Sequence, residues 1–247
     1  GYNYMELAIG NDGLRFLLDD MSVTVGETTY SSDEVTNKIK EGNTAYTAAS
    51  TGELSETDMN TIISYATSRG ISIIPLLNSP GHMDAIINCM KSLGMKKVAY
   101  EDSKRTIDVT NAEAVKFTTN LIAKYVTYFA GKDCKVFNMG ADEYANDKTN
   151  GFSDLISKGK YKYFVDYVNN IAAVIKNAGM VPMAFNDGIY YNNQTGYGTF
   201  YSDIAISYWT PGWPSYNPAA ASFLAGKGHK IINTNDAWYY VLGRGTG

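Results

Sequence analysis

Hydrophobic and polar residues along this chain follow a repeated pattern: an amphipathic helix, then a glycine, then a short apolar strand. Residues 55–69 carry apolar side chains at helical spacing, and Ser55 and Asp58 have the arrangement of a capping box at the helix start. Gly70 follows as a C-terminal cap, and the apolar run 71–77 then predicts a buried strand.

The same pattern recurs and predicts six strands in all. We predict further helices over 111–130, 162–178 and 218–225, and strands over 3–9, 71–77, 135–139, 180–185, 204–208 and 230–233. Strands that alternate with helices form parallel βα units, and nearly continuous apolar strands indicate burial on both faces of the sheet. The segments 23–52 and 96–108 are predicted to be long polar connections.

Six strands are fewer than the eight of a closed (β/α)8 barrel of the TIM type. The chain opens almost directly on a strand and ends soon after the strand at 230–233. We therefore predict an α/β fold in which residues 1–247 are part of a single catalytic barrel domain, a fragment of about six βα units lacking a strand at each end. The competing prediction is an open doubly wound sheet, but no phosphate-binding turn follows the first strand to support it.

Composition excludes several classes of function. Of the 247 residues, 45% are hydrophobic and 19% charged, the net charge is −4, and there is no run of lysine or arginine. These values argue against nucleic acid or an anionic membrane surface as a partner. No apolar stretch approaches the roughly 18–20 residues of a membrane span. No phosphate-cradling glycine loop or dinucleotide motif is present, so no cofactor is predicted.

Two cysteines and two histidines are too few for a His/Cys metal cluster. An all-carboxylate site stays open but has no spacing signal, so no metal is predicted. Cys89 and Cys134 each lie in an apolar stretch, which favours buried thiols, although a disulfide between them stays open. Tyrosine is abundant, at 20 residues, which suits stacking on sugar rings but fits plain drift in composition better.

The strongest candidate for chemistry is the pair of adjacent acids Asp142 and Glu143, which ends the apolar segment 135–139. Barrel enzymes place their catalytic residues at the carboxyl ends of the strands. Most acid pairs are merely solvated surface charge, but this pair is one of several chemically active groups at predicted strand ends. Other chemically active side chains also follow predicted strands, namely His82, Trp209, Trp238 and Tyr239.

These motifs resemble the catalytic domain of glycoside hydrolase family 20, the β-N-acetylhexosaminidases and lacto-N-biosidases, in the branch found in bacterial cell-surface enzymes. The resemblance extends from Asn11 to Tyr239 and is most specific over 107–143. It implies that Glu143 is the general acid/base, which protonates the departing glycosidic oxygen and later accepts a proton from water. Asp142 would hold the N–H of the substrate's 2-acetamido group, whose oxygen is the nucleophile in this family.

The resemblance places a tyrosine near the end of the chain in the catalytic set. Tyr239 would hydrogen-bond the acetamido carbonyl and aim it at the anomeric carbon, and Trp238 would bind substrate beside it. Tyr240 is the less favoured alternative, because neighbouring residues on a strand face opposite sides.

The remaining pocket residues are also implied by the resemblance. Trp209 would form an apolar wall against the N-acetyl methyl and the sugar face, and His82 would orient or tune the acid pair. Asn138, where the family often has a histidine, and Asp187 match further substrate-binding positions. Trp213 is predicted either to line an outer subsite or to cover the end of the barrel.

Several positions depart from the family pattern. The carboxylate partner expected for the histidine is replaced by Asn78, and the aspartate pair after the first strand reads Asn11 and Asp12. Phe185 stands where a tryptophan is expected, and Val241 where an acid or amide is expected. The family arginine that grips the distal sugar hydroxyls would lie on a strand before residue 1. Altered hydroxyl contacts beside an intact acetamido pocket suggest changed specificity within the same chemistry.

The expected function is therefore an exo-β-N-acetylhexosaminidase that releases terminal N-acetylglucosamine from glycans by a retaining, substrate-assisted mechanism. The alternatives are a lacto-N-biosidase that releases a disaccharide and a non-catalytic glycan-binding barrel. The expected partners are a glycan substrate and the remainder of the barrel, supplied by the rest of the chain. A secreted or cell-surface location follows from the resemblance alone.

Overall fold

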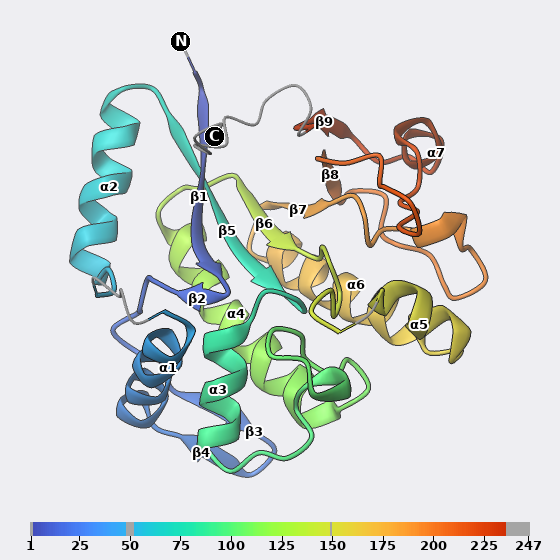
Figure 1. Ribbon diagram of the computed structural model, residues 1–247. Coiled ribbons are helices and arrows are strands. Elements are labelled where there is room, and N and C mark those ends of the chain that lie inside the picture. The colour runs from blue at the N-terminus through green and yellow to red at the C-terminus, as the bar shows by residue number, and fades with distance from the viewer. Residues whose placement is uncertain (1, 48–51, 149, 236–247) are drawn as a thin grey trace, which may run out of the picture.

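The computed structural model describes residues 2–47, 52–148 and 150–235, which form one main sheet flanked by helices (Figure 1). The sheet has seven strands in the order β2-β1-β5-β6-β7-β8-β9. These strands are β1 (Tyr4–Asn11), β2 (Gly13–Leu14), β5 (Ser72–Ser79), β6 (Val136–Gly140), β7 (Val181–Phe185), β8 (Ala205–Tyr208) and β9 (Ile231–Asn233).

Neighbouring strands from β1 to β9 are all parallel, and only the short β2 pairs antiparallel with β1. Each parallel strand joins the same growing edge in chain order, without the reversal that defines a doubly wound sheet. This winding confirms the predicted TIM-barrel type of fold. Within the described residues β1 and β9 do not pair with each other, so the sheet is a partial barrel.

Helices link the strands in the manner of βα units. They are α1 (Ser32–Tyr46), α2 (Glu56–Ser68), α3 (Asp84–Ser92), α4 (Ala112–Gly131), α5 (Gly151–Ser157), α6 (Tyr161–Asn177) and α7 (Ala221–Gly226), with short 3-10 turns η1 (Tyr100–Asp102) and η2 (Tyr191–Asn193). Helices α4 and α6 contact each other and lie behind β6 and β7 (Figure 1). Phe129, Phe137 and Phe164 on these elements have no exposed surface, so the core lies between the sheet and this helical layer.

All six predicted strands are present, and the predicted helices match α2, α4, α6 and a shorter α7. The predicted capping box is confirmed, since the Ser55 side chain accepts from the Asp58 N–H and the Asp58 carboxylate accepts from the Ser55 N–H. The glycines predicted to end helices adopt positive φ at Gly70 and Gly179, which is the conformation that a helix C-terminal cap requires.

The prediction of a polar connection over residues 23–52 was wrong for most of its length. The segment holds the hairpin of β3 (Val23–Val25) and β4 (Thr28–Tyr30), followed by α1. Helix α1 is polar overall and buries few apolar side chains, chiefly Val35 and Ile39, so it does not stand out from a polar connection. Its capping box at Ser31 and Glu34 was the sequence signal that could have revealed it. Helices α3 and α5 and strand β2 were also not predicted.

Cys89 and Cys134 are both buried and free, as the apolar context favoured. Among the described residues, none of the helices is both long and apolar enough to cross a membrane.

Candidate active site

The acid pair lies on the turn that follows β6, and a glycine makes this turn possible. Gly140 has a φ of 78°, and a Cβ atom there would lie 1.8 Å from the Asn78 Oδ1 atom. Only a residue without a side chain fits this approach. Beyond it, Ala141 and Glu143 adopt φ values of 69° and 47°, which non-glycine residues rarely take. Backbone strain of this kind commonly marks a functional site.

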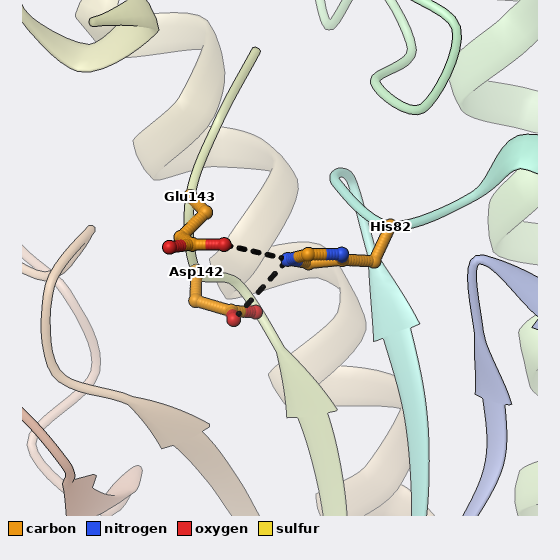
Figure 2. A group of neighbouring side chains, drawn as sticks. All are labelled: His82, Asp142 and Glu143. Atoms are coloured by element: carbon orange, nitrogen blue, oxygen red, sulfur yellow. Dashed lines mark hydrogen bonds and ion pairs between the residues drawn. The ribbon is translucent and has the colours of Figure 1, made fainter. Parts of the chain in front are cut away.

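His82, on the turn after β5, joins the two acids (Figure 2). Its Nε2 atom lies 3.1 Å from Glu143 Oε2 and 3.5 Å from Asp142 Oδ2. The three side chains expose only 11%, 22% and 12% of their surfaces for His82, Glu143 and Asp142 respectively. Two neighbouring strands thus bring residues that are about 60 positions apart in sequence, 82 and 142–143, to one edge of the sheet.

The other ring nitrogen of His82 is held by Asp12, which follows β1. The His82 Nδ1 and Asp12 Oδ1 atoms are 3.0 Å apart. The prediction that the histidine had lost its carboxylate partner was therefore wrong: Asp12 supplies the carboxylate, and Asn78 has another role. The three residues form a continuous chain from Asp12 through His82 to Glu143.

These contacts favour the doubly protonated form of His82. Burial lowers the pKa of His82, but the hydrogen bonds to Asp12 and Glu143 and the charge of Asp142 outweigh it and raise that pKa to about 10. Burial also raises the pKa of Asp12, but the hydrogen bond and charge of His82 and the nearby Arg105 bring that pKa below its usual value. A positive charge is thus held between the carboxylates.

Asp142 is held from the opposite side by Asn78. The Asn78 Nδ2 atom donates to Asp142 Oδ1 at 2.8 Å. Burial raises the pKa of Asp142, while the charge of His82 and the Asn78 hydrogen bond act against that rise. Asn78 thereby orients the carboxylate that the resemblance assigns to the acetamido group.

Glu143 is fixed through both its side chain and its backbone. Asn146 donates from Nδ2 to Glu143 Oε2 at 2.7 Å, and the Glu143 N–H donates to Asp187 Oδ2 at 2.9 Å. The carboxylate of Glu143 can therefore reach only a limited set of positions.

Asp187 lies after β7 and is completely buried. Its Oδ1 atom accepts from Trp209 Nε1 at 2.8 Å, and its Oδ2 atom accepts from the Tyr216 hydroxyl at 2.5 Å as well as from the Glu143 N–H. Burial and the nearby Asp142 raise the pKa of Asp187 to about 7, although the three hydrogen bonds oppose this. Asp187 thus connects the acid turn to the aromatic side chains of Trp209 and Tyr216. Its predicted contact with substrate stays a prediction.

Asn138 is also completely buried, in the middle of β6. Its Nδ2 atom donates to Glu6 Oε2 at 2.8 Å, and its Oδ1 atom accepts from the Gly140 N–H at 2.9 Å. It therefore links β1 to the start of the acid turn, and its predicted substrate-binding role stays a prediction. Burial raises the pKa of Glu6, which Asn138 partly offsets.

A cavity of about 350 Å³ opens beside these residues. Its lining combines polar and aromatic side chains: Glu6, Asn11, Leu76, Asn78, Phe185, Ser207, Trp209 and Thr234. Ligand pockets typically join apolar walls to a few fixed polar groups. Trp209 and Phe185 both lie in this lining, and the predicted contact of Trp209 with the N-acetyl methyl stays a prediction.

The structure thus brings together five of the predicted site residues, namely Asp142, Glu143, His82, Trp209 and Asp187. Trp238 and Tyr239, together with Tyr240 and Val241, lie outside the described residues. Their predicted roles are carried forward as predictions.

Within the described residues, one group of three His, Cys, Asp or Glu side chains is close enough to share a metal ion, since the ligand atoms of His82, Asp142 and Glu143 lie within 4.8 Å of one another. An imidazole coordinates a metal through an unprotonated nitrogen. The raised pKa of His82 opposes that role. The arrangement is therefore better suited to moving or holding a proton.

Sequence reasoning missed the roles of Asn146, Tyr216 and Glu6, and misjudged those of Asp12 and Asn78. The spacing of Asn146, three residues after Glu143, is the one local signal that was available. The other contacts join residues at least 29 positions apart, such as Tyr216 and Asp187, and no local pattern announces them.

Comparisons with known proteins identify the family of this chain. The family model described as glycosyl hydrolase family 20, catalytic domain, matches residues 11–246. A structure of the pneumococcal virulence factor StrH is 47% identical with a TM-score of 0.95, covering 100% of this chain and 61% of that chain. A structure of the tandem GH20 catalytic modules of the pneumococcal exo-beta-D-N-acetylglucosaminidase StrH is also 47% identical with a TM-score of 0.95, covering 99% and 60%.

A curated relative, the lacto-N-biosidase of Bifidobacterium bifidum, is 28% identical over 214 residues, which are 83% of this chain and 18% of that protein. The chain thus spans less than two thirds of the length of these relatives. The match nevertheless covers the whole acid turn, the histidine turn and the aromatic wall. On this evidence the chain belongs to glycosyl hydrolase family 20, and its sequence is that of a catalytic domain of this family.

Proposed function

We propose that this chain contributes the catalytic centre of an exo-acting β-N-acetylhexosaminidase, which releases terminal N-acetylglucosamine from glycans with retention of configuration. The observation that carries this proposal is the position of Asp142 and Glu143 on one turn, both in contact with His82 Nε2. Two carboxylates that share one turn and one histidine are poorly placed to act from opposite faces of a sugar ring, as an ordinary glycosidase pair does.

In this proposal Glu143 protonates the glycosidic oxygen as the bond to the leaving group breaks. Its hydrogen-bond partners, His82 and Asn146, hold the carboxyl at the rim of the turn. When Glu143 has lost its proton, the protonated ring of His82 donates to the carboxylate and stabilises it. Asp12 holds the opposite ring nitrogen, so the imidazole keeps its orientation through both half-reactions.

Asp142 has the complementary task of handling the acetamido group. The substrate's own acetamido oxygen attacks the anomeric carbon, forming a cyclic oxazolinium intermediate, and water later opens this ring. Asp142 accepts the acetamido N–H and balances the positive charge of the intermediate. The hydrogen bond from Asn78 to Asp142 Oδ1 supports this role, because it fixes the orientation of the carboxylate.

Trp209 would form the apolar wall of the acetamido pocket, with Trp238 beside it, and Tyr239 would hydrogen-bond the acetamido carbonyl. The Trp209 ring is held by its own N–H bond to Asp187, which supports a fixed wall rather than a mobile one. Asn138 and Asp187 would be the remaining substrate-binding residues of the pocket.

A lacto-N-biosidase is the second candidate, since the curated relative from Bifidobacterium bifidum bears that name. It would share the acetamido-assisted step but accommodate a disaccharide. Chromogenic N-acetylglucosaminide and lacto-N-bioside substrates, assayed in parallel on the full-length protein, separate the two. Binding of a glycan without turnover of either substrate would instead support a non-catalytic glycan-binding barrel.

The two acids should fail in different ways when each is replaced. We expect Glu143→Gln to lower kcat by about 10²–10⁴-fold for poor leaving groups and far less for activated aryl leaving groups, which need little proton donation. Asp142→Asn should slow the first step for every leaving group, because the oxazolinium ion loses its counter-charge. Asp133→Asn, at an exposed acid before β6, is the matched control and should leave kcat unchanged.

The nucleophile can be tested directly. A thiazoline mimic of the cyclic intermediate should inhibit tightly, because it resembles the species that the pocket stabilises. A 2-fluoro sugar that lacks the acetamido group should leave no adduct on the protein. A covalent sugar on Asp142 or Glu143, seen by mass spectrometry, would return this chain to the two-carboxylate class.

The remaining parts of the proposal concern the whole protein. The family fold closes with eight strands, so the remainder of the barrel, including an arginine for the distal hydroxyls, is proposed to come from the rest of the chain. A secreted or cell-surface location is proposed from the family resemblance.

A further inference from the structure

A tight turn after β8 stacks two aromatic rings next to the candidate site. Trp213 and Tyr216 exchange backbone hydrogen bonds of 3.2 and 2.8 Å, and their rings lie 4.2 Å apart at an angle of 7°. Pro214 occupies the second position of this turn, and Ser215 has a φ of 70° at the third, which are features of a type II turn. The stacked pair is therefore rigidly built.

The two rings have opposite surroundings. Trp213 exposes 46% of its surface, whereas Tyr216 exposes 6%. The Tyr216 ring is enclosed by Phe152 and Tyr191, with ring centroids at 6.4 and 5.5 Å. Trp213 thus offers one open aromatic face to solvent, and Tyr216 supports it from inside.

The hydroxyl of Tyr216 contacts Asp187, the buried carboxylate that also binds the acid turn. It donates to Asp187 Oδ2, the same oxygen atom that accepts the backbone N–H of Glu143. The tyrosine hydroxyl and the backbone of the candidate general acid are therefore held by one atom. Any shift of this carboxylate moves Glu143 and Tyr216 together, because a buried group must keep its hydrogen-bond partners.

We propose that Tyr216 is a positioning residue for Glu143: acting through the Asp187 carboxylate, it fixes where the general acid stands and links that position to the exposed Trp213 ring. The inference rests on the proposed function, since Glu143 must be the acid for its position to matter. The proposal also places the Trp213 ring on the leaving-group side: it packs edge-on against Trp209 of the cavity lining, with ring centroids 6.2 Å apart, and a sugar ring would stack on its open face.

Charge explains why the hydroxyl matters. Three donors converge on Asp187, from Trp209, Tyr216 and Glu143, and they favour its ionised form, because a protonated carboxyl would add a further buried O–H donor to this set. The other ionisable groups that act on it are Asp142, whose charge opposes its ionisation, and Tyr161 on α6. Burial raises the pKa of Asp187 to about 7, and the Tyr216 hydroxyl is one of the bonds that restrain this rise. Without it, Asp187 takes up a proton at higher pH and one donor is displaced.

The test is Tyr216→Phe in the full-length protein, which keeps the stacked ring and removes only the hydroxyl. We expect kcat to fall about 10-fold for a poor leaving group such as a disaccharide and to change little for an activated aryl glycoside, with KM for the aryl glycoside unchanged. The acidic limb of the kcat profile should move to higher pH, because Asp187 then ionises later.

The matched control is Tyr191→Phe. It removes a hydroxyl from the same aromatic cluster, one that bonds Asn150 and Asn217 and does not touch Asp187. This variant should keep the wild-type pH profile and leaving-group dependence. Equal effects of the two variants, or a Tyr216→Phe enzyme with an unmoved acidic limb, would overturn the positioning role.

A third variant, Trp213→Ala, tests the link to the leaving group. We expect it to raise KM for glycan substrates several-fold and leave aryl glycosides unaffected; an unchanged KM for glycans would remove Trp213 from the proposal. Failure of the proposed function looks different, because then the wild-type protein itself would not cleave an N-acetylglucosaminide.

Discussion

At the scale of single residues, the central feature is a chain of three side chains, Asp12, His82 and Glu143. Each link is a hydrogen bond of 3.0 to 3.1 Å between groups that are largely buried. A buried carboxylate next to an imidazole stabilises the charged ring and fixes which nitrogen faces the reacting groups. The third member, Glu143, therefore hydrogen-bonds a His82 ring whose protonation is stabilised by Asp12 at the opposite nitrogen.

Replacing Asp12 tests this arrangement. Asp12→Asn should lower the pKa of His82, now about 10, and reduce kcat by about 10-fold or more. His82 has a folded-state pKa above its unfolded value of about 6.5, so its stabilisation is full below about pH 6.5 and is lost as pH rises towards 10. The free energy of unfolding should accordingly differ between wild type and variant by about 1.5–3 kcal/mol near pH 6 and converge near pH 10.

Proton NMR of the two histidines provides the measurement. His229 is an internal control, because burial lowers its pKa and its Nδ1 atom bonds only the Ile204 carbonyl. A titration in which His82 and His229 move equally in the variant, or in which His82 does not move, would contradict the assigned chain.

At the scale of secondary-structure elements, the site depends on how β5 and β6 end. The two strands pair in parallel with a register shift between the Leu76–Asn138 and Ser79–Gly140 pairs. Gly140 adopts positive φ directly against the Asn78 side chain, and Asn78 in turn holds Asp142. One strand end thus positions the carboxylate carried by the next.

Gly140→Ala should break the hydrogen bond between Asn78 and Asp142. The added methyl overlaps Asn78 Oδ1 and Cγ, at 1.8 and 2.4 Å, so Asn78 must leave Asp142. We expect a loss of roughly 2–4 kcal/mol of stability and a fall in kcat for the protein that remains folded. Gly179→Ala is the matched control: its φ is 84° and no atom lies within 4 Å of the new methyl.

The control variant should therefore lose only the cost of positive φ, about 1 kcal/mol, and keep its wild-type kcat. Thermal unfolding and kcat measured together separate the two contributions. Similar losses in both variants would mean that the contact with Asn78 has no special role.

At the scale of the whole molecule, the described part of the sheet has two open edges. Strands β1 and β9 occupy the ends of the parallel series and do not pair with each other. Tyr4 and Met5 on β1 are 57% and 49% exposed, and Ile232 on β9 is 43% exposed. Open strand edges with apolar side chains promote pairing between molecules.

Residues 1–247 produced alone should therefore associate. We expect light scattering to detect oligomers, and Met5→Lys, a charge on the β1 edge, to reduce them. Tyr65→Lys, at a tyrosine on α2 that is 63% exposed, should have no effect. A monodisperse, cooperatively melting monomer would contradict the prediction that these edges need further strands.

The sequence by itself was sufficient for the six parallel strands, for four of the helices and for the acid pair. Helical periodicity, capping residues and short apolar runs are local signals, so they predicted α2, α4, α6 and all six parallel strands. Adjacent acids at the end of a buried strand are also a local pattern, and together with the family motifs they indicated the chemistry. Helix α1 escaped detection because most of its residues are polar, and its only large buried apolar side chains are Val35 and Ile39.

Only the tertiary structure decided which side chains act together. Asp12 is the carboxylate partner of His82 that the sequence pattern at Asn78 had suggested was lost. Asp187 is a buried carboxylate that accepts hydrogen bonds from both Glu143 and Tyr216. These contacts join strand ends that are distant in the chain, and their geometry depends on register, on a glycine that admits a close approach, and on burial. Sequence periodicity carries none of this information, because hydrogen bonding between strand ends is set by the three-dimensional packing of the barrel.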